Sequence, residues 1–190
     1  KLDPRVLRPA NYPDRAPGSG SVVLETLGGQ KVGLLNLQGR VFMDPVVDCP
    51  FRTAEREVQR LRLSTSIILV DMHAEATSEK VALGWFLDGK VSCIVGTHTH
   101  IQTADERILP KGTGFLTDLG MTGPYDSVIG RDTQAIVERF LSGVPGKAEV
   151  ASSNIQLRGA LVEIDPATGK ATHIERVALA LKDAVKDVRP

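Results

Sequence analysis

Two short apolar runs, separated by one helix-length segment, most constrain what this chain can fold into. Residues 67–72 and 91–96 are rich in aliphatic and β-branched side chains, as in a strand buried on both faces of a parallel sheet. The segment 78–87 between them has apolar residues at helical spacing. A strand–helix–strand unit of this kind is parallel and nearly always right-handed. The pattern predicts an α/β core.

Histidines follow both apolar runs. His73 closes the first run, and His98 and His100 come directly after the second. Side chains of an extended strand alternate between faces, so we expect His98 and His100 to point the same way. Parallel sheets bind ligands at the carboxyl ends of their strands, where neighbouring strands lie about 5 Å apart. Since neutral imidazole is a common metal ligand, the spacing predicts a metal site.

Several carboxylates near the same strand ends are further candidates. A ligating histidine usually donates its other N–H to a carboxylate or a carbonyl, and we expect this role of one of them. The sequence leaves open which one it is among Asp71, Glu75, Asp105, Glu106 and Asp118. The fourth histidine, His173, lies in a predicted hairpin and is interpreted as an ordinary structural residue.

The flanking segments predict β-hairpins on either side of the core. One hairpin is expected from strands at 21–27 and 31–37, and another from strands at 159–164 and 171–177. The other predicted elements are helices at 53–63, with Thr53 as N-cap, and at 132–141, short strands at 108–110 and 114–117, and a glycine-rich loop at 120–131.

The segment 117–130 is a second candidate for chemistry. Its glycines, threonines and serine can present backbone N–H groups and hydroxyls to an anion such as phosphate. Glycine-rich loops are usually only turns, so the interpretation of this segment as a phosphate-binding loop depends on the neighbouring metal site. Thr122 and Gly123 are the predicted substrate contacts.

Composition removes other classes of function. Lys plus Arg and Asp plus Glu both number 23, so the zero net charge gives no reason to expect a nucleic acid or an anionic membrane as partner. No apolar run approaches the roughly 18 residues of a membrane span. Cys49 and Cys93 lack any disulfide or metal-binding spacing. We therefore expect a cytoplasmic protein with a single domain over residues 1–190.

Longer motifs carry a family resemblance. The segments 71–80, 96–113 and 117–130, together with 8–13, 39–42 and 49–54, resemble the YmdB-type family. This is a group of calcineurin-like metallophosphoesterases associated with 2′,3′-cyclic-nucleotide 2′-phosphodiesterase activity. The resemblance runs over nearly the whole chain. It implies a calcineurin-like sandwich, of which this chain is the C-terminal part.

The resemblance also implies a two-metal hydrolase acting on a small phosphodiester, such as a cyclic nucleotide. By this likeness His73 and His98 bind one ion and His100 binds the other. A hydroxide bridging the ions would attack the phosphorus while the metals clamp the phosphate oxygens. The family leads us to expect iron or manganese, and zinc also suits such ligands.

Three motifs of the family do not occur in this sequence. The family's GD, EN and GNH motifs supply an aspartate, a bridging glutamate, an asparagine ligand and a histidine thought to be the general acid. The general-acid histidine therefore has no counterpart here, and no catalytic residue is assigned. We expect an N-terminally truncated domain that holds half of the dinuclear site and has weak or no activity alone.

Two other interpretations remain from the residues. The chain could be a non-catalytic metal-binding or interaction module, in which an uncovered sheet face or edge favours a homo-oligomer. It could also be a mononuclear zinc amidohydrolase, which likewise uses a His-x-His pair. That fold needs an eight-stranded barrel of about 250 residues, and too few strands are predicted here.

Overall fold

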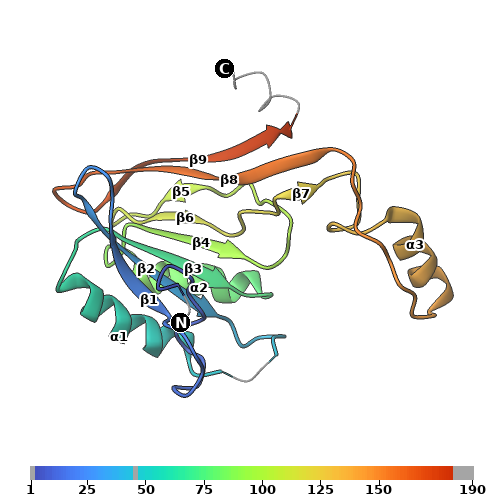
Figure 1. Cartoon of the computed structure of the whole chain (residues 1–190). Helices are drawn as coiled ribbons and strands as arrows, with labels where there is room; N and C mark the ends of the chain where they lie inside the picture. Colours follow the sequence, from blue (N-terminus) through green and yellow to red (C-terminus); the bar gives the residue numbers. More distant parts are fainter. Residues whose placement is uncertain (1–2, 45–46, 182–190) are drawn as a thin grey trace.

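The computed structural model describes residues 3–44 and 47–181, and these form two β-sheets with helices (Figure 1). The larger sheet has the order β1-β2-β3-β4-β6-β5, and the smaller has the order β7-β8-β9. No helix in these two ranges is long and apolar enough to cross a membrane. The elements are β1 Ser21–Glu25, β2 Lys31–Gln38, α1 Pro50–Arg62, β3 Ile68–His73, α2 Thr77–Leu87, β4 Cys93–Thr97, β5 Arg107–Ile108, β6 Gly114–Leu116, β7 Gly123–Pro124, α3 Thr133–Ser142, β8 Ile155–Ile164 and β9 Ala171–Ala180.

The centre of the larger sheet is parallel. Strands β2, β3, β4 and β6 pair with one another in the same direction, and α2 connects β3 to β4. The predicted α/β core with a strand–helix–strand unit is therefore confirmed. The register sets His73, the last residue of β3, opposite Thr97, the last residue of β4. This pairing brings together the ends of β3 and β4, which carry the candidate metal ligands.

The larger sheet is packed on both faces (Figure 1). On one face, α1 and α2 bury Val58, Leu61 and Leu83 against the strands. On the other face, Cys93 and Leu116 pack against Ile174 of β9. Burying a large aliphatic side chain is worth about 1.5–3 kcal/mol, so these two clusters stabilise a helix–sheet–sheet arrangement.

Both predicted hairpins are present, as β1–β2 and β8–β9. Several boundaries differ: β8 begins at Ile155 rather than at 159, and β9 ends at Ala180 rather than at 177. Helix α1 begins at Pro50 rather than at Thr53, and Thr53 is buried inside the helix. Proline suits the first helical position, where its missing N–H costs nothing. Strand β7 lies within the predicted loop 120–131, because Gly123 and Pro124 pair with β8.

Part of the second face remains lightly covered. Leu34, Leu69 and Val95 are only half-buried and line a hollow of about 300 Å³ beside Arg5 and Leu7. The unpaired sheet face or edge expected from the sequence stays a prediction.

Helix α3 lies away from both sheets, in a segment that we call the arm (residues 131–150; Figure 1). No residue of α3 is buried. The helix depends on its own caps, since Asp132 accepts a hydrogen bond from Ala135 N and Gly143 ends the helix at φ 69°. The ends of the arm meet through a bridge between Arg131 and Val150.

Candidate metal centre

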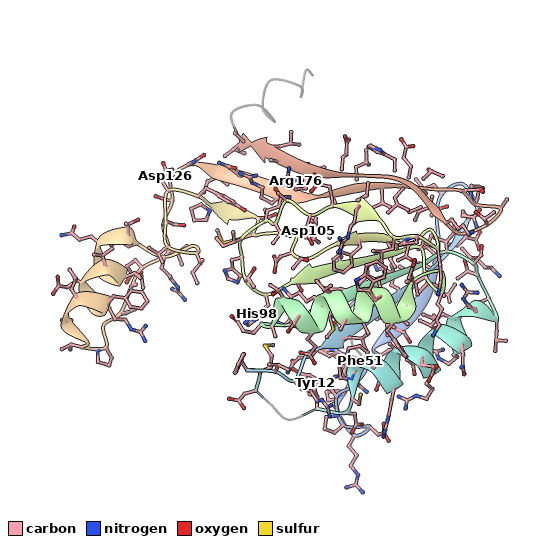
Figure 2. All side chains as sticks on the ribbon, turned by 180° about the vertical axis from the view of Figure 1, so that it is seen from behind. Tyr12, Phe51, His98, Asp105, Asp126 and Arg176 are labelled. Carbon is pink, nitrogen blue, oxygen red and sulfur yellow. The ribbon has the colours of Figure 1, made fainter. Side chains whose placement is uncertain are left out.

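His73 and His98 face each other at the carboxyl edge of the larger sheet. His98 follows the last residue of β4, and Figure 2 shows it beside one end of α2. Its Nδ1 lies 3.1 Å from Nε2 of His73. The two rings are nearly perpendicular, at 89°, with centroids 4.8 Å apart. Parallel pairing of β3 with β4 has produced this contact.

A chain of polar contacts orients the two rings. The Thr97 hydroxyl donates to Asp71 Oδ1 at 2.8 Å, and Thr97 Oγ1 also lies 3.0 Å from His73 Nδ1. Because the single hydroxyl proton of Thr97 is donated to Asp71, Thr97 Oγ1 accepts a hydrogen bond from His73 Nδ1. The lone pair of the His73 ring is therefore on Nε2. Nε2 of His98 lies 3.0 Å from Glu75 Oε2.

The arrangement suits two ligands of one metal ion. Metal–nitrogen bonds of about 2.0–2.1 Å set two ligating nitrogens on one ion about 3.0–3.4 Å apart, close to the observed separation of His73 Nε2 and His98 Nδ1. Burial lowers the pKa of His73, and the neighbouring His98 lowers it further. The ring therefore stays neutral, as a metal ligand must be, to a lower pH than a free histidine.

His100 lies apart from this pair. Its side chain is exposed and its Nδ1 is 3.3 Å from the carbonyl oxygen of Ile129. The prediction that His98 and His100 share a face of an extended strand is wrong, because β4 ends at Thr97. Both histidines instead have left-handed backbone, at φ 110° and 66°. Among the described residues, no three His, Cys, Asp or Glu side chains are gathered closely enough to hold a metal ion.

The five candidate carboxylates have different hydrogen-bond and ion-pair partners. Glu75 contacts His98 directly, and Asp71 reaches His73 through Thr97. These two contacts are of the kind expected of a carboxylate that orients a ligating ring. The remaining three bind elsewhere: Asp105 accepts from Thr117, Glu106 pairs with Arg176, and Asp118 pairs with Lys80.

Many backbone N–H groups of the loop 117–130 already donate hydrogen bonds within the protein. Leu119 N donates to the Gly96 carbonyl, Gly120 N to Asp118, and Gly130 N to Ser127. These N–H groups are not turned toward an incoming anion. Thr122 is exposed, and Gly123 belongs to β7, paired with Gln156 of β8. Phosphate binding by Thr122 and Gly123 stays a prediction.

Three residues of the site were not predicted from the sequence. Thr97 links Asp71 to His73, Thr99 contacts Asp118, and Lys80 is buried beside them. Lys80 had a readable signal, since it stands on the same helical stripe as the buried Leu83 and Leu87. A lysine on the apolar stripe of a helix needs a partner. Nothing local distinguishes Thr97 or Thr99 from ordinary loop threonines.

Fold and site together define a layered α/β protein with paired imidazoles at the carboxyl edge of its parallel strands. The model of the YmdB-like protein family matches residues 1–177, and the chain belongs to this family. It is 47% identical over 176 residues to the 2′,3′-cyclic-nucleotide 2′-phosphodiesterase of Bacillus subtilis, covering 93% of this chain and 66% of the relative.

Two solved structures are also similar. A hypothetical protein from Thermus thermophilus matches with a TM-score of 0.84 and 40% identity, over 92% of this chain and 67% of that one. A novel phosphatase from Mycoplasma pneumoniae matches with a TM-score of 0.85 and 35% identity, over 94% and 64%. The chain thus spans about two thirds of the length of these relatives.

Proposed function

We propose that this chain contributes to a metal-dependent phosphodiesterase whose fold is a calcineurin-like sandwich. The observation that carries the proposal is the 3.1 Å approach of His73 Nε2 to His98 Nδ1 at the edge of the parallel strands. The phosphodiesterase named among the relatives supports the reaction class. The substrate we propose is a small phosphodiester, with 2′,3′-cyclic nucleotides first.

His73 and His98 would hold one ion, and His100 would hold a second. Iron or manganese is our first expectation, and zinc is compatible with the same nitrogens. Two ions, when bound, supply Lewis acidity to the phosphoryl oxygens and activate water at neutral pH. The chain's own contribution is to hold His73 with its lone pair on Nε2 through Thr97, and to fix His98 through Glu75.

We propose further that these histidines form only part of the site. In the described ranges the two facing rings have no third close ligand of the His, Cys, Asp or Glu type. The remaining ligands and the proton donor for the leaving alcohol would then come from outside this set. Slow hydrolysis by the isolated chain follows. The cytoplasmic location and self-association expected from the sequence stay predictions.

Metal titration and hydrolysis together test the proposal. The chain should bind Mn²⁺ or Co²⁺ in calorimetry, and His73→Ala and His98→Ala should each weaken binding at least about tenfold. The matched control is His173→Ala, which removes an exposed histidine of β9. Equal affinity in all variants would refute the metal site.

The hydrolysis arm uses bis-p-nitrophenyl phosphate and a 2′,3′-cyclic nucleotide with added Mn²⁺. We expect turnover far below that of the full-length Bacillus subtilis relative. Turnover equal to that relative would contradict the partial site. A chain that binds no metal and self-associates in light scattering would favour the interaction module instead.

A further inference from the structure

Lys80 and Asp118 form a buried ion pair close behind residues 98–100, which we call the histidine loop. Lys80 Nζ lies 2.8 Å from Asp118 Oδ2, and their side chains are 1% and 0% exposed. Removing two charges from water is costly, and an apolar pair of similar volume is often as stable or more stable. Stability alone is therefore a weak reason for this pair. Its other contacts point to a second role.

Asp118 holds the residue between the two loop histidines. Its Oδ2 accepts from Thr99 N at 3.1 Å and from Thr99 Oγ1 at 2.8 Å, in addition to Lys80. Its Oδ1 accepts from Gly120 N at 2.9 Å. Three donors on one oxygen suit a carboxylate, and Lys80 is the cationic partner beside it. The pair therefore ties α2 to the loop that follows β4.

The histidine loop needs such an anchor. His98 and His100, on either side of Thr99, have φ angles of 110° and 66°. A non-glycine residue in this region is strained and persists only where the surroundings determine its conformation. Gly96 leaves room for the anchor, since a Cβ there would lie 2.7 Å from Lys80 Cδ.

We propose that Lys80 and Asp118 are positioning residues that fix Thr99, and with it the ring of His98 against His73. The link to metal loading rests on the proposed function. The link to ring geometry does not, because it concerns only the contact between His73 and His98. Neither residue touches a reacting atom. Their effect passes through Thr99.

The test begins with Thr99→Val, which removes the hydroxyl and leaves the ion pair in place. Thr99→Ser keeps the hydroxyl and should rescue the effect. The control is Thr172→Val, the same change on β9, where the hydroxyl contacts Glu163 O at 3.3 Å. A double variant, Lys80→Met with Asp118→Leu, removes the pair without leaving an unpaired buried charge. Urea unfolding shows whether each variant keeps its stability.

Two readouts separate positioning from packing. One is the ¹⁵N spectrum of the imidazoles, which reports the hydrogen bond between His98 Nδ1 and His73 Nε2 without metal. The other is calorimetric Mn²⁺ affinity. We expect Thr99→Val and the double variant to remain folded, to change the His98 and His73 ring signals, and to bind Mn²⁺ about 10–100-fold more weakly. Thr99→Ser and Thr172→Val should match the wild type.

Folded variants whose ring signals match the wild type would overturn the proposal, whatever their metal affinity. Failure of Thr99→Ser to rescue would overturn it as well. If the double variant unfolds, Thr99→Val decides. If the wild-type chain binds no Mn²⁺, the proposed function fails, and the ring signals alone decide the positioning role.

Discussion

His73 is neutral at a lower pH than an ordinary histidine because its ring is partly buried and faces His98. Its pKa in the folded chain lies below the value of 6.5 expected when unfolded. The unfolded chain therefore takes up this proton first as the pH falls. Because the unfolded chain binds this proton more tightly than the folded chain, the free energy of unfolding decreases as the pH drops below about 6.5.

Urea titrations at about pH 7.5 and about pH 5.5 measure this contribution. His73→Gln should lose less stability between the two pH values than the wild type does. His173→Gln removes an exposed histidine and should retain the wild-type loss. A His73→Gln variant with the full wild-type pH dependence would contradict the assignment.

Cys93 illustrates the same effect of burial on another residue. The residue is 2% exposed, and burial raises the pKa of its thiol to about 12. Only about one such thiol in ten thousand is ionised near pH 8, and the thiolate is the reactive form. Ellman's reagent should therefore react with Cys93→Ser, which retains Cys49, and not with folded Cys49→Ser. Rapid reaction of folded Cys49→Ser would show that Cys93 is accessible.

At the scale of elements, β4 depends on a glycine. A Cβ on Gly96 would lie 1.8 Å from the carbonyl oxygen of Thr117, which is backbone and cannot simply turn aside. We expect Gly96→Ala to lower the free energy of unfolding by about 3 kcal/mol or more. Gly159→Ala on β8 is the control, because nothing lies within 4 Å of its new Cβ. That variant should stay within about 0.5 kcal/mol of the wild type in urea unfolding.

The elements that sequence reasoning recovered are those with a local signal. Apolar runs and the 28–30 turn marked β1 to β4, and the helix predicted over 132–141 is present as α3. The two-residue strand β7 has no such signal, since its pairing depends on β8, which lies some thirty residues further along.

The candidate site was predictable to a similar degree. Placing His73 beside His98 required only that two parallel strands end together. The left-handed backbone of His98 and His100 was not predictable, because nothing in the local sequence signals it and the contact from Thr99 N to Asp118 joins it to another strand end. Lys80 and Asp118 are 38 positions apart, and only the fold brings them into contact.

For the whole molecule, the arm should be dispensable for folding. Asp132 N donates to the Glu149 carbonyl at 2.9 Å, so the two ends already meet as in a hairpin. Replacing residues 133–148 by Asn-Gly, a pair that suits a two-residue hairpin turn, should change the free energy of unfolding by less than about 1 kcal/mol. Urea unfolding and the imidazole spectrum would measure the effect. A loss above about 2 kcal/mol would show that the arm supports the sheets.

The two ends of the arm are hydrogen-bonded to each other. The distance that the arm spans between its flanking segments is therefore short and does not depend on the number of residues within the arm. Insertions and deletions between residues 133 and 148 should therefore be tolerated more easily than elsewhere, and family members should vary most in length there. The same position suits a fluorescent reporter or an affinity tag. Such an insertion would mark the protein without moving the strand ends that carry His73 and His98.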